Sequence, residues 1–249
     1  MTPLPENRPV GFFDSGLGGL CILNAFKELF PAESTVYVAD RANCPYGNKT
    51  SGEITRLSER IVRFLIDVHN VKMIVVACNT ATAASIDFLR REYPQIPFIG
   101  IEPAIKPAVL HSKTGIVGVL ATKGTFDGRL YKETSARFAG KTNIVMSVAD
   151  EFVALVESGK TDGPEADETV ERIIRPLIER GCDHIVLGCT HFPHLIGAIK
   201  KAAAGKAEII EPSYPVAKHA GNVLRQLGVV SASQSPTHVF IDTSIVEIP

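Results

Sequence analysis

Short apolar runs rich in valine, isoleucine and phenylalanine alternate along the chain with longer segments of helical period. Such runs are typical of buried strands, and the segments between them predict helices. The runs lie at residues 10–13, 35–39, 73–77, 98–101, 115–120, 143–148, 184–188 and 208–210. This alternation predicts an α/β fold in which mostly parallel sheets are flanked by helices.

The segment SGEITRLSERIVRFLIDVH at residues 51–69 has the clearest helical period. Its apolar residues recur at steps of three and four, so one stripe of the predicted helix faces a sheet. Ser51 is expected to cap its N-terminal end. The stripe consists of Ile54, Leu57, Ile61, Leu65 and Val68.

The chain also contains an internal repeat. MIVVACNT at 73–80 and HIVLGCTH at 184–191 each place a cysteine, Cys78 or Cys189, directly after an apolar run. A strand followed by a glycine-rich turn precedes each copy, at 11–19 and 115–125. This order predicts two pseudosymmetric α/β lobes, roughly residues 1–100 and 101–211, with a cleft between them. The tail from residue 212, which contains a helical segment and then strand-like THVFID, must pack on one of the lobes.

Composition and charge narrow the functional classes. Of 249 residues, 45% are hydrophobic and 21% are charged, and the net charge is -1. Because there is no basic cluster, we expect no nucleic acid and no anionic membrane as a partner. No stretch approaches the roughly 20 apolar residues of a membrane span. The first ten residues lack an apolar signal-peptide core, which favours a cytoplasmic location.

The five cysteines include no Cys-x-x-Cys pair. They indicate free thiols in a reducing compartment rather than a disulfide framework or a zinc ribbon. Cys189, His191 and His194 lack an accompanying carboxylate or cysteine pair, so no metal site is expected. A dinucleotide fingerprint beginning at Gly16 would need glycine where the chain has Cys21, and no cofactor is expected either.

The repeated cysteines lie where a thiol becomes chemically useful. In parallel sheets, ligands bind at the carboxyl ends of the strands, where the next helices begin. Helix N-termini favour anions and can lower a thiol pKa from about 8.5 into the range of roughly 3.5–7.5. A single cysteine after a strand is more often a small buried hydrophobic residue. Two equivalent copies, each followed by a hydrogen-bonding Asn79 or Thr190, favour a functional role.

Two thiols on opposite faces of a ligand suit the inversion of a stereocentre that bears an acidic hydrogen. One group removes the proton from one face, another delivers a proton to the other face, and the reverse reaction exchanges their roles. One ionised and one neutral thiol meet this need. Asp14 fits either a turn or a functional carboxylate. His191 fits either a structural histidine or a proton-transfer partner of Cys189.

Six motifs together resemble the glutamate racemase family, and they run in family order over nearly the whole chain. The resemblance implies two pseudosymmetric domains, with the last helix and the rest of 212–249 returning to the first lobe. It also implies cofactor-independent two-base racemisation of L- and D-glutamate, which supplies D-glutamate for peptidoglycan. A homodimer and activation by a cell-wall precursor are further implications. The motifs are DSGLGG (14–19), PYGNK (45–49), ACNTAT (77–82), GIEPAIKPA (100–108), ATKGT (121–125) and GCTHFPHL (188–195).

The same resemblance implies roles for individual residues. Cys78 acts on one face with Asp14 close by, and Cys189 acts on the other, assisted by His191 and Glu157. Relatives often carry Cys-Pro before the helix that bears the assisting glutamate, where this chain has Ala149 and Asp150, so Glu151 competes with Glu157 for that role. The implied substrate pocket consists of Ser15, Asp40, Pro45, Tyr46, Gly47, Asn79, Thr80, Thr122, Thr125 and Thr190.

Two alternative functions remain open from the sequence. An aspartate or broad-specificity amino-acid racemase would share the two thiols and differ in the pocket for the side-chain carboxylate. A two-lobed amino-acid-binding protein would close on its ligand without reacting, but it would not need paired thiols.

Overall fold

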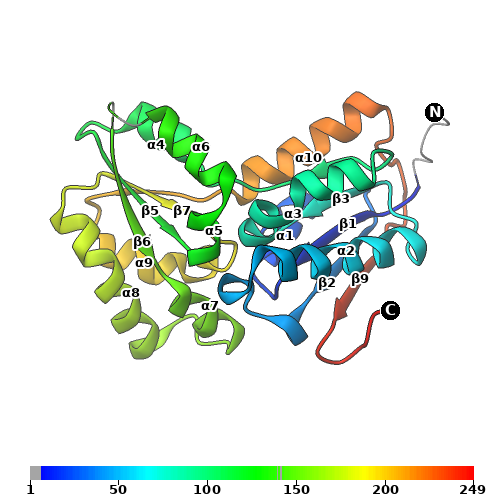
Figure 1. Ribbon diagram of the computed structural model, residues 1–249, viewed down its shortest axis with the longest axis horizontal. Helices are drawn as coiled ribbons and strands as arrows, with labels where there is room; N and C mark the ends of the chain where they lie inside the picture. Colours follow the sequence, from blue (N-terminus) through cyan, green and yellow to red (C-terminus); the bar gives the residue numbers. More distant parts are fainter. Residues whose placement is uncertain (1–6, 139, 141) are drawn as a thin grey trace.

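The computed structural model describes residues 7–138, 140 and 142–249 and contains two β-sheets (Figure 1). The first sheet has the strand order β4-β3-β1-β2-β9 and the second the order β6-β5-β7-β8, and the pairings between neighbours are parallel. The predicted fold class is confirmed, and each of the eight apolar runs overlaps a strand. The strands are β1 Val10–Asp14, β2 Thr35–Ala39, β3 Met73–Val76, β4 Phe98–Ile99, β5 Ile116–Ala121, β6 Asn143–Val148, β7 His184–Leu187, β8 Glu208–Ile210 and β9 His238–Asp242.

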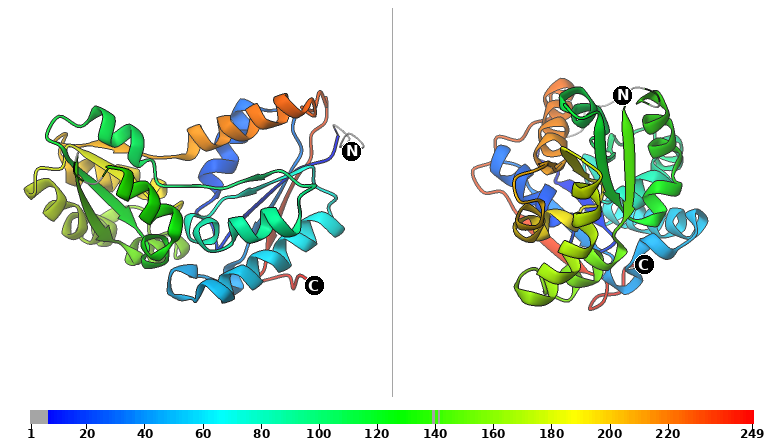
Figure 2. Two further views of the ribbon diagram at one scale, coloured as in Figure 1. Left: turned by 45° about the horizontal axis from the view of Figure 1, so that its top comes forward. Right: turned by 90° about the vertical axis from the view of Figure 1, so that its left-hand side faces the viewer.

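Helices cover both faces of each sheet (Figures 1 and 2). On the first sheet, α1 and α10 pack on one face and α2 and α3 on the other. On the second sheet, α7, α8 and α9 pack on one face and α4 and α6 on the other. The helices are α1 Leu20–Leu29, α2 Ser51–Asp67, α3 Asn79–Glu92, α4 Ile105–His111, α5 Lys123–Asp127, α6 Arg129–Phe138, α7 Asp150–Glu157, α8 Gly163–Glu179, α9 Ile196–Ala203 and α10 Ser213–Leu227, with short 3₁₀ helices η1 Arg41–Asn43, η2 Tyr46–Asn48 and η3 Phe192–Leu195.

The two sheets repeat one topology. The order β4-β3-β1-β2 in the first corresponds to β8-β7-β5-β6 in the second. Cys78 follows β3 and Cys189 follows β7, so the two cysteines come after equivalent strands. The glycine-rich turns follow β1 and β5, which lie beside β3 and β7. The repeat seen in the sequence is therefore a repeat of strand order in the structure.

The C-terminal segment packs on the first sheet. Strand β9 pairs with β2, and Ala217, Ala220 and Leu224 of α10 share a core cluster with Phe26 and Phe30 of the α1 region. Figure 2 shows α10, in orange, lying along the part of the molecule that contains the first sheet. We propose that residues 1–100 with 212–249 form the first lobe and residues 101–211 the second.

Helix α2 differs from its prediction at both ends. Thr50, not Ser51, is the N-cap, and it forms a capping box in which Thr50 and Glu53 satisfy each other's backbone N–H groups. Ile54, Ile61 and Leu65 are buried as expected. Val68 lies beyond the last helical residue and is 59% exposed, so it is not part of the buried stripe.

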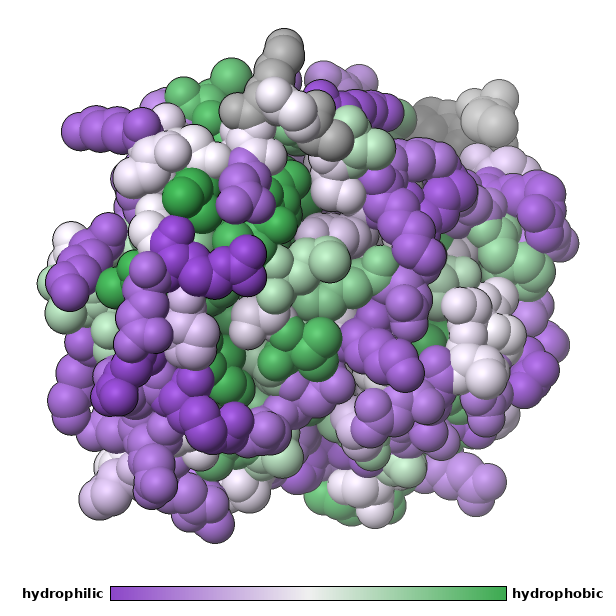
Figure 3. All heavy atoms as spheres, turned by 60° about the vertical axis from the view of Figure 1, so that its left-hand side comes forward, coloured by the Kyte–Doolittle hydropathy of each residue, from purple (hydrophilic) through white to green (hydrophobic). Residues whose placement is uncertain are grey.

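Hydrophilic residues cover most of the face drawn in Figure 3, with hydrophobic residues scattered between them. Larger apolar side chains are exposed on edge strands, including Met146 on β6 and Phe240 on β9. Within the part of the chain that the structure describes, no helix has the length and apolar character to cross a membrane. Residues 1–6, which belong to the segment searched for a signal peptide, lie outside the described residues.

Candidate active site

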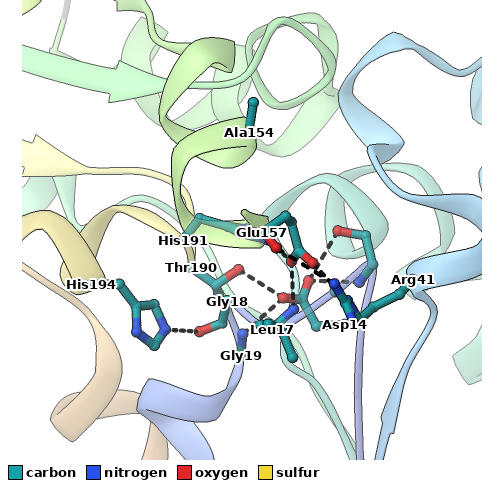
Figure 4. A network of polar contacts seen from close by, with 12 residues as sticks. Asp14, Leu17, Gly18, Gly19, Arg41, Ala154, Glu157, Thr190, His191 and His194 are labelled. Atoms are coloured by element: carbon teal, nitrogen blue, oxygen red, sulfur yellow. Dashed lines mark hydrogen bonds and ion pairs between the residues drawn. The ribbon is translucent and has the colours of Figure 1, made fainter. Parts of the chain in front are cut away.

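Asp14 ends β1 and is fully buried. Its Oδ1 accepts hydrogen bonds from the Ser15 N–H at 2.7 Å and the Ser15 hydroxyl at 3.3 Å. Its Oδ2 accepts from the Gly19 N–H at 2.7 Å and the Thr190 hydroxyl at 3.3 Å (Figure 4). Because Thr190 follows β7, Asp14 joins the turn after β1 to the turn that carries Cys189.

Cys78 caps the N-terminus of α3. Its Sγ accepts a hydrogen bond from the Ala81 N–H at 3.4 Å, and its thiol donates to Ser15 Oγ at 3.9 Å. Burial, followed by the negative charge of Asp14, raises the pKa of Cys78 well above 9.0. The helix start, which can lower a thiol pKa, does not do so for Cys78, because burial outweighs the backbone donor. Cys78 is a neutral thiol at neutral pH.

Cys189 begins a chain of three side chains. Its Sγ lies 3.7 Å from His191 Nδ1, and His191 Nε2 lies 2.7 Å from Glu157 Oε1. Burial alone would lower the pKa of His191, but hydrogen bonds to Cys189 and Glu157 and the charge of Asp14 raise it to about 10. Burial alone would raise the pKa of Glu157, but hydrogen bonds from His191, Leu17 and Arg41 lower it. At neutral pH, His191 is therefore an imidazolium between Cys189 and a carboxylate.

Glycines in the turn after β1 make room for this chain. A Cβ atom at Gly16 would lie 2.0 Å from Glu157 Oε1, and one at Gly18 would lie 2.5 Å from His191 Nδ1. The Leu17 N–H between them donates to Glu157 Oε1 at 2.6 Å. The glycine-rich turn therefore serves close approach between lobes, and its backbone binds a carboxylate of the protein itself.

Sequence reasoning missed Arg41. Its Nε donates to Glu157 Oε2 and its Nη1 to Asp242 Oδ2, both at 3.0 Å (Figure 4 shows the Glu157 contact). Arg41 thus links β9 of the first lobe to the end of α7 in the second. Its partners lie 116 and 201 residues away in sequence, and no local pattern marks such a contact.

Hydroxyl groups gather where α3 meets α5. Thr80 Oγ1 lies 2.8 Å from Thr122 Oγ1 and 3.3 Å from Thr125 Oγ1, and all three side chains are buried. The Asn79 side chain is only 2% exposed, and neither its amide nitrogen nor its oxygen has a hydrogen-bond partner. A buried amide without a partner is costly, so Asn79 is the clearest sign of a ligand position near Cys78.

Asp40 holds the loop that follows β2. Its carboxylate accepts hydrogen bonds from the Tyr46 hydroxyl at 2.6 Å and the Thr243 hydroxyl at 2.8 Å, and from the Asn43 amide. These partners engage both oxygens. Asp40 therefore positions Pro45, Tyr46 and Gly47, and a direct contact between Asp40 and substrate stays a prediction.

A cavity of about 500 Å³ opens beside the Cys189 chain. Glu157 and Ala154 of α7 line one side, and Cys44, Pro45 and Gly47 of the first lobe line the other. Glu151 also lines it, but its carboxylate pairs with Arg172 on the surface, whereas Glu157 contacts His191. The geometry thus brings together the predicted Cys189, His191 and Glu157, with Pro45, Gly47 and Thr122 on the cavity wall.

His194, which the sequence places near the Cys189 turn, contacts the turn after β1. Its Nε2 is 3.1 Å from the carbonyl oxygen of Gly18. It therefore adds a further contact between the turn after β7 and the turn after β1 (Figure 4).

Comparisons with known proteins agree with this geometry. Residues 21–220 match the model of the Asp/Glu/Hydantoin racemase family. The glutamate racemase of Herpetosiphon aurantiacus is 40% identical, with 92% of this chain and 90% of that protein covered. That of Deinococcus radiodurans is 41% identical, with 92% of this chain and 79% of that protein covered.

Solved structures of glutamate racemases are also similar to this protein. Escherichia coli glutamate racemase, in complex with L-glutamate and the activator UDP-MurNAc-Ala, superposes with a TM-score of 0.85 at 30% identity, covering 96% of this chain and 91% of that one. A glutamate racemase isoform of Bacillus anthracis gives a TM-score of 0.85 at 30% identity, covering 96% of this chain and 89% of that one. The chain therefore belongs to the Asp/Glu/hydantoin racemase family and, within it, to the glutamate racemases.

Proposed function

We propose that the protein interconverts L- and D-glutamate by proton transfer between its own side chains. The observation that carries this proposal is the placement of Cys78 and Cys189 after equivalent strands of two duplicated sheets, each beside a different polar network. Family membership supports glutamate as the substrate, since relatives of high identity are glutamate racemases.

The two thiols have different polar neighbours. His191, as an imidazolium, places a positive charge beside Cys189, with its Nδ1 3.7 Å from that sulfur. Cys78, whose pKa burial raises, stays neutral and can give a proton. In one direction, the Cys189 thiolate removes the Cα proton and the Cys78 thiol protonates the opposite face. In the other direction, the roles are exchanged.

In this mechanism, the substrate is held by polar groups that neighbour one or the other thiol. The unpartnered amide of Asn79 can both donate to a carboxylate and accept from an ammonium group. The hydroxyls of Ser15, Thr80 and Thr190 and the first N–H groups of α3 supply further donors. Asp14, whose carboxylate is already saturated with donors, fixes the turn beside Cys78 and Thr190.

The relatives support a wider role. The family supplies D-glutamate for peptidoglycan, and the Escherichia coli relative was solved with the activator UDP-MurNAc-Ala. We propose that this protein serves the same synthesis in the cytoplasm, where its five free thiols stay reduced.

Val239 and Phe240, exposed on edge strand β9, support contact with a second copy in a homodimer. Light scattering of the purified protein tests the dimer.

The test of function compares racemisation of L-glutamate and L-aspartate by the wild type, Cys78→Ser, Cys189→Ser and the control Cys21→Ser. We expect glutamate to be the better substrate, and each active-site serine variant to lose about 10²–10⁴-fold in kcat. Full activity in both serine variants would exclude the two-thiol mechanism. Faster turnover of aspartate would favour a broader racemase, and tight binding of glutamate without turnover would favour a binding protein.

A further inference from the structure

Three side chains of metal-ligating type meet at the cavity. A ring nitrogen of His191, a carboxylate oxygen of Glu157 and Sγ of Cys44 all lie within 4.8 Å of one another. Cys44 comes from the loop between η1 and η2 of the first lobe, whereas Glu157 and His191 belong to the second. The group therefore forms only where the lobes meet, and the proposed racemisation does not use Cys44.

The donor set points to a particular class of metal ion. Thiolate, imidazole and carboxylate are the usual ligands of Zn²⁺, and Zn²⁺ sites with three protein ligands keep a fourth position open for water or another small ligand. A thiolate disfavours Mg²⁺ and Ca²⁺, which prefer oxygen. Tetrahedral bonds of about 2.0–2.3 Å place ligand atoms roughly 3.3–3.8 Å apart. The three observed ligand atoms lie within 4.8 Å of one another, and His191 Nε2 and Glu157 Oε1 are 2.7 Å apart, so the observed separations bracket that spacing.

The site is accessible, but it has competitors. Cys44 and Glu157 both line the cavity of about 500 Å³, which gives an ion a path to the group. Glu157 Oε1 already accepts from His191 and Leu17, and Arg41 lies 3.0 Å from Oε2. An ion must displace the His191 contact and tolerate the nearby guanidinium. It must also displace one proton from the Cys44 thiol, whose pKa burial raises to about 12, and one from the His191 imidazolium, and both protons pass to solvent. These costs suit a reversible site and not a permanent structural one.

We propose that Cys44, Glu157 and His191 form a zinc site through which the metal inhibits the enzyme reversibly. Coordination replaces the contact between His191 Nε2 and Glu157 Oε1 and removes the ring proton that makes His191 a cation beside Cys189, so proton transfer at that thiol stops. The inhibitory consequence rests on the proposed racemase function, whereas the binding itself does not.

Binding is tested first with Co²⁺ and no substrate, because a cobalt–thiolate bond gives a charge-transfer band in the near ultraviolet. We expect the band in the wild type and in Cys21→Ser, whose thiol lies outside the group, and not in Cys44→Ser. Circular dichroism confirms that each variant is folded. No band in the wild type, or an equal band in Cys44→Ser, overturns the site whether or not the protein racemises glutamate.

Inhibition is tested next with Zn²⁺. Loss of even an outer-shell partner costs 10–100-fold in metal affinity, so the half-inhibiting concentration should rise at least about tenfold in Cys44→Ser and stay unchanged in Cys21→Ser. A chelator should restore wild-type activity. Equal inhibition of Cys44→Ser and wild type would place the metal on the Cys78 and Cys189 thiols and overturn the proposal. Absence of any racemisation, with the cobalt band present, would count against the proposed function and leave the site standing.

Discussion

His191 Nε2 lies 2.7 Å from Glu157 Oε1, so a buried imidazole in the turn after β7 is joined to the carboxylate that ends α7. The pair gives Cys189 a charged neighbour, and the second lobe alone supplies all three side chains. Arg41 and the Leu17 N–H then hold the carboxylate from the first lobe. In the proposed mechanism, proton transfer at Cys189 therefore depends on how the lobes meet.

Replacing His191 should slow racemisation strongly. His191→Asn removes the cation beside Cys189, and we expect kcat to fall by about 10²–10⁴-fold. Glu157→Gln keeps the shape and loses the charge, so its effect should be smaller and in the same direction. Steady-state kinetics with L-glutamate and with D-glutamate measures kcat for both variants. Wild-type kcat in His191→Asn would show that Cys189 works without this neighbour.

Stability should fall as pH rises above neutrality. The ordinary histidine pKa is 6.5 and that of His191 is raised to about 10, so the folded state holds this proton more tightly than the unfolded state. The stabilisation is complete below pH 6.5 and is lost as pH rises toward 10. Urea unfolding between about pH 6.5 and 7.5, at least roughly one unit below the ordinary thiol pKa of about 8.5, should show this loss in the wild type and a flatter profile in His191→Asn. Parallel profiles would contradict the raised pKa.

A single methyl group at Gly18 should disturb the site without unfolding the protein. The added Cβ would lie 2.5 Å from His191 Nδ1 and 2.7 Å from the His191 backbone nitrogen, so the turn after β1 or the histidine must move. We expect Gly18→Ala to lose most of its racemase activity and to keep its circular dichroism spectrum. Gly52→Ala is the matched control, because nothing lies within 4 Å of the added atom. Equal activity of the two variants would contradict the close approach.

The buried ion pair between Lys72 and Glu33 should matter for stability and not for chemistry. Their charged atoms are 2.7 Å apart, both side chains are buried, and Lys72 Nζ also donates to the Val229 carbonyl at 2.8 Å. Lys72→Met leaves the Glu33 charge buried, which typically costs about 3–5 kcal/mol. Arg91→Ala, which removes an exposed pair with Glu92, should cost less than about 1 kcal/mol. Urea unfolding measures the loss in free energy of unfolding for each variant. Equal losses in the two variants would contradict the importance of burial.

The repeat and the strands could be predicted because both are local patterns. Each strand is a short apolar run, and the equivalence of Cys78 and Cys189 is visible in the residues around them. The cap of α2 was misplaced by one residue because Thr50 and Ser51 are both good caps, and only the reciprocal contact with Glu53 distinguishes them.

Contacts between the lobes could not be predicted in the same way. Arg41 and Cys44 reach Glu157 and His191 only because the fold brings distant segments together. The sequence also left open which thiol is neutral, since a helix start can lower a thiol pKa and only the structure shows the burial that raises the pKa of Cys78. Only the structure distinguishes Glu157 from Glu151, because Glu157 contacts His191 whereas Glu151 pairs with Arg172.

The most direct test of the account is racemisation of L-glutamate by the purified protein in deuterated water, with a chelator and no added cofactor. With one thiol on each face, D-glutamate formed at early conversion should carry deuterium at Cα, while the recovered L-glutamate keeps its hydrogen. Deuterium appearing equally fast in recovered L-glutamate would indicate a single base serving both faces. D-glutamate without deuterium would contradict exchange with the solvent through two thiols.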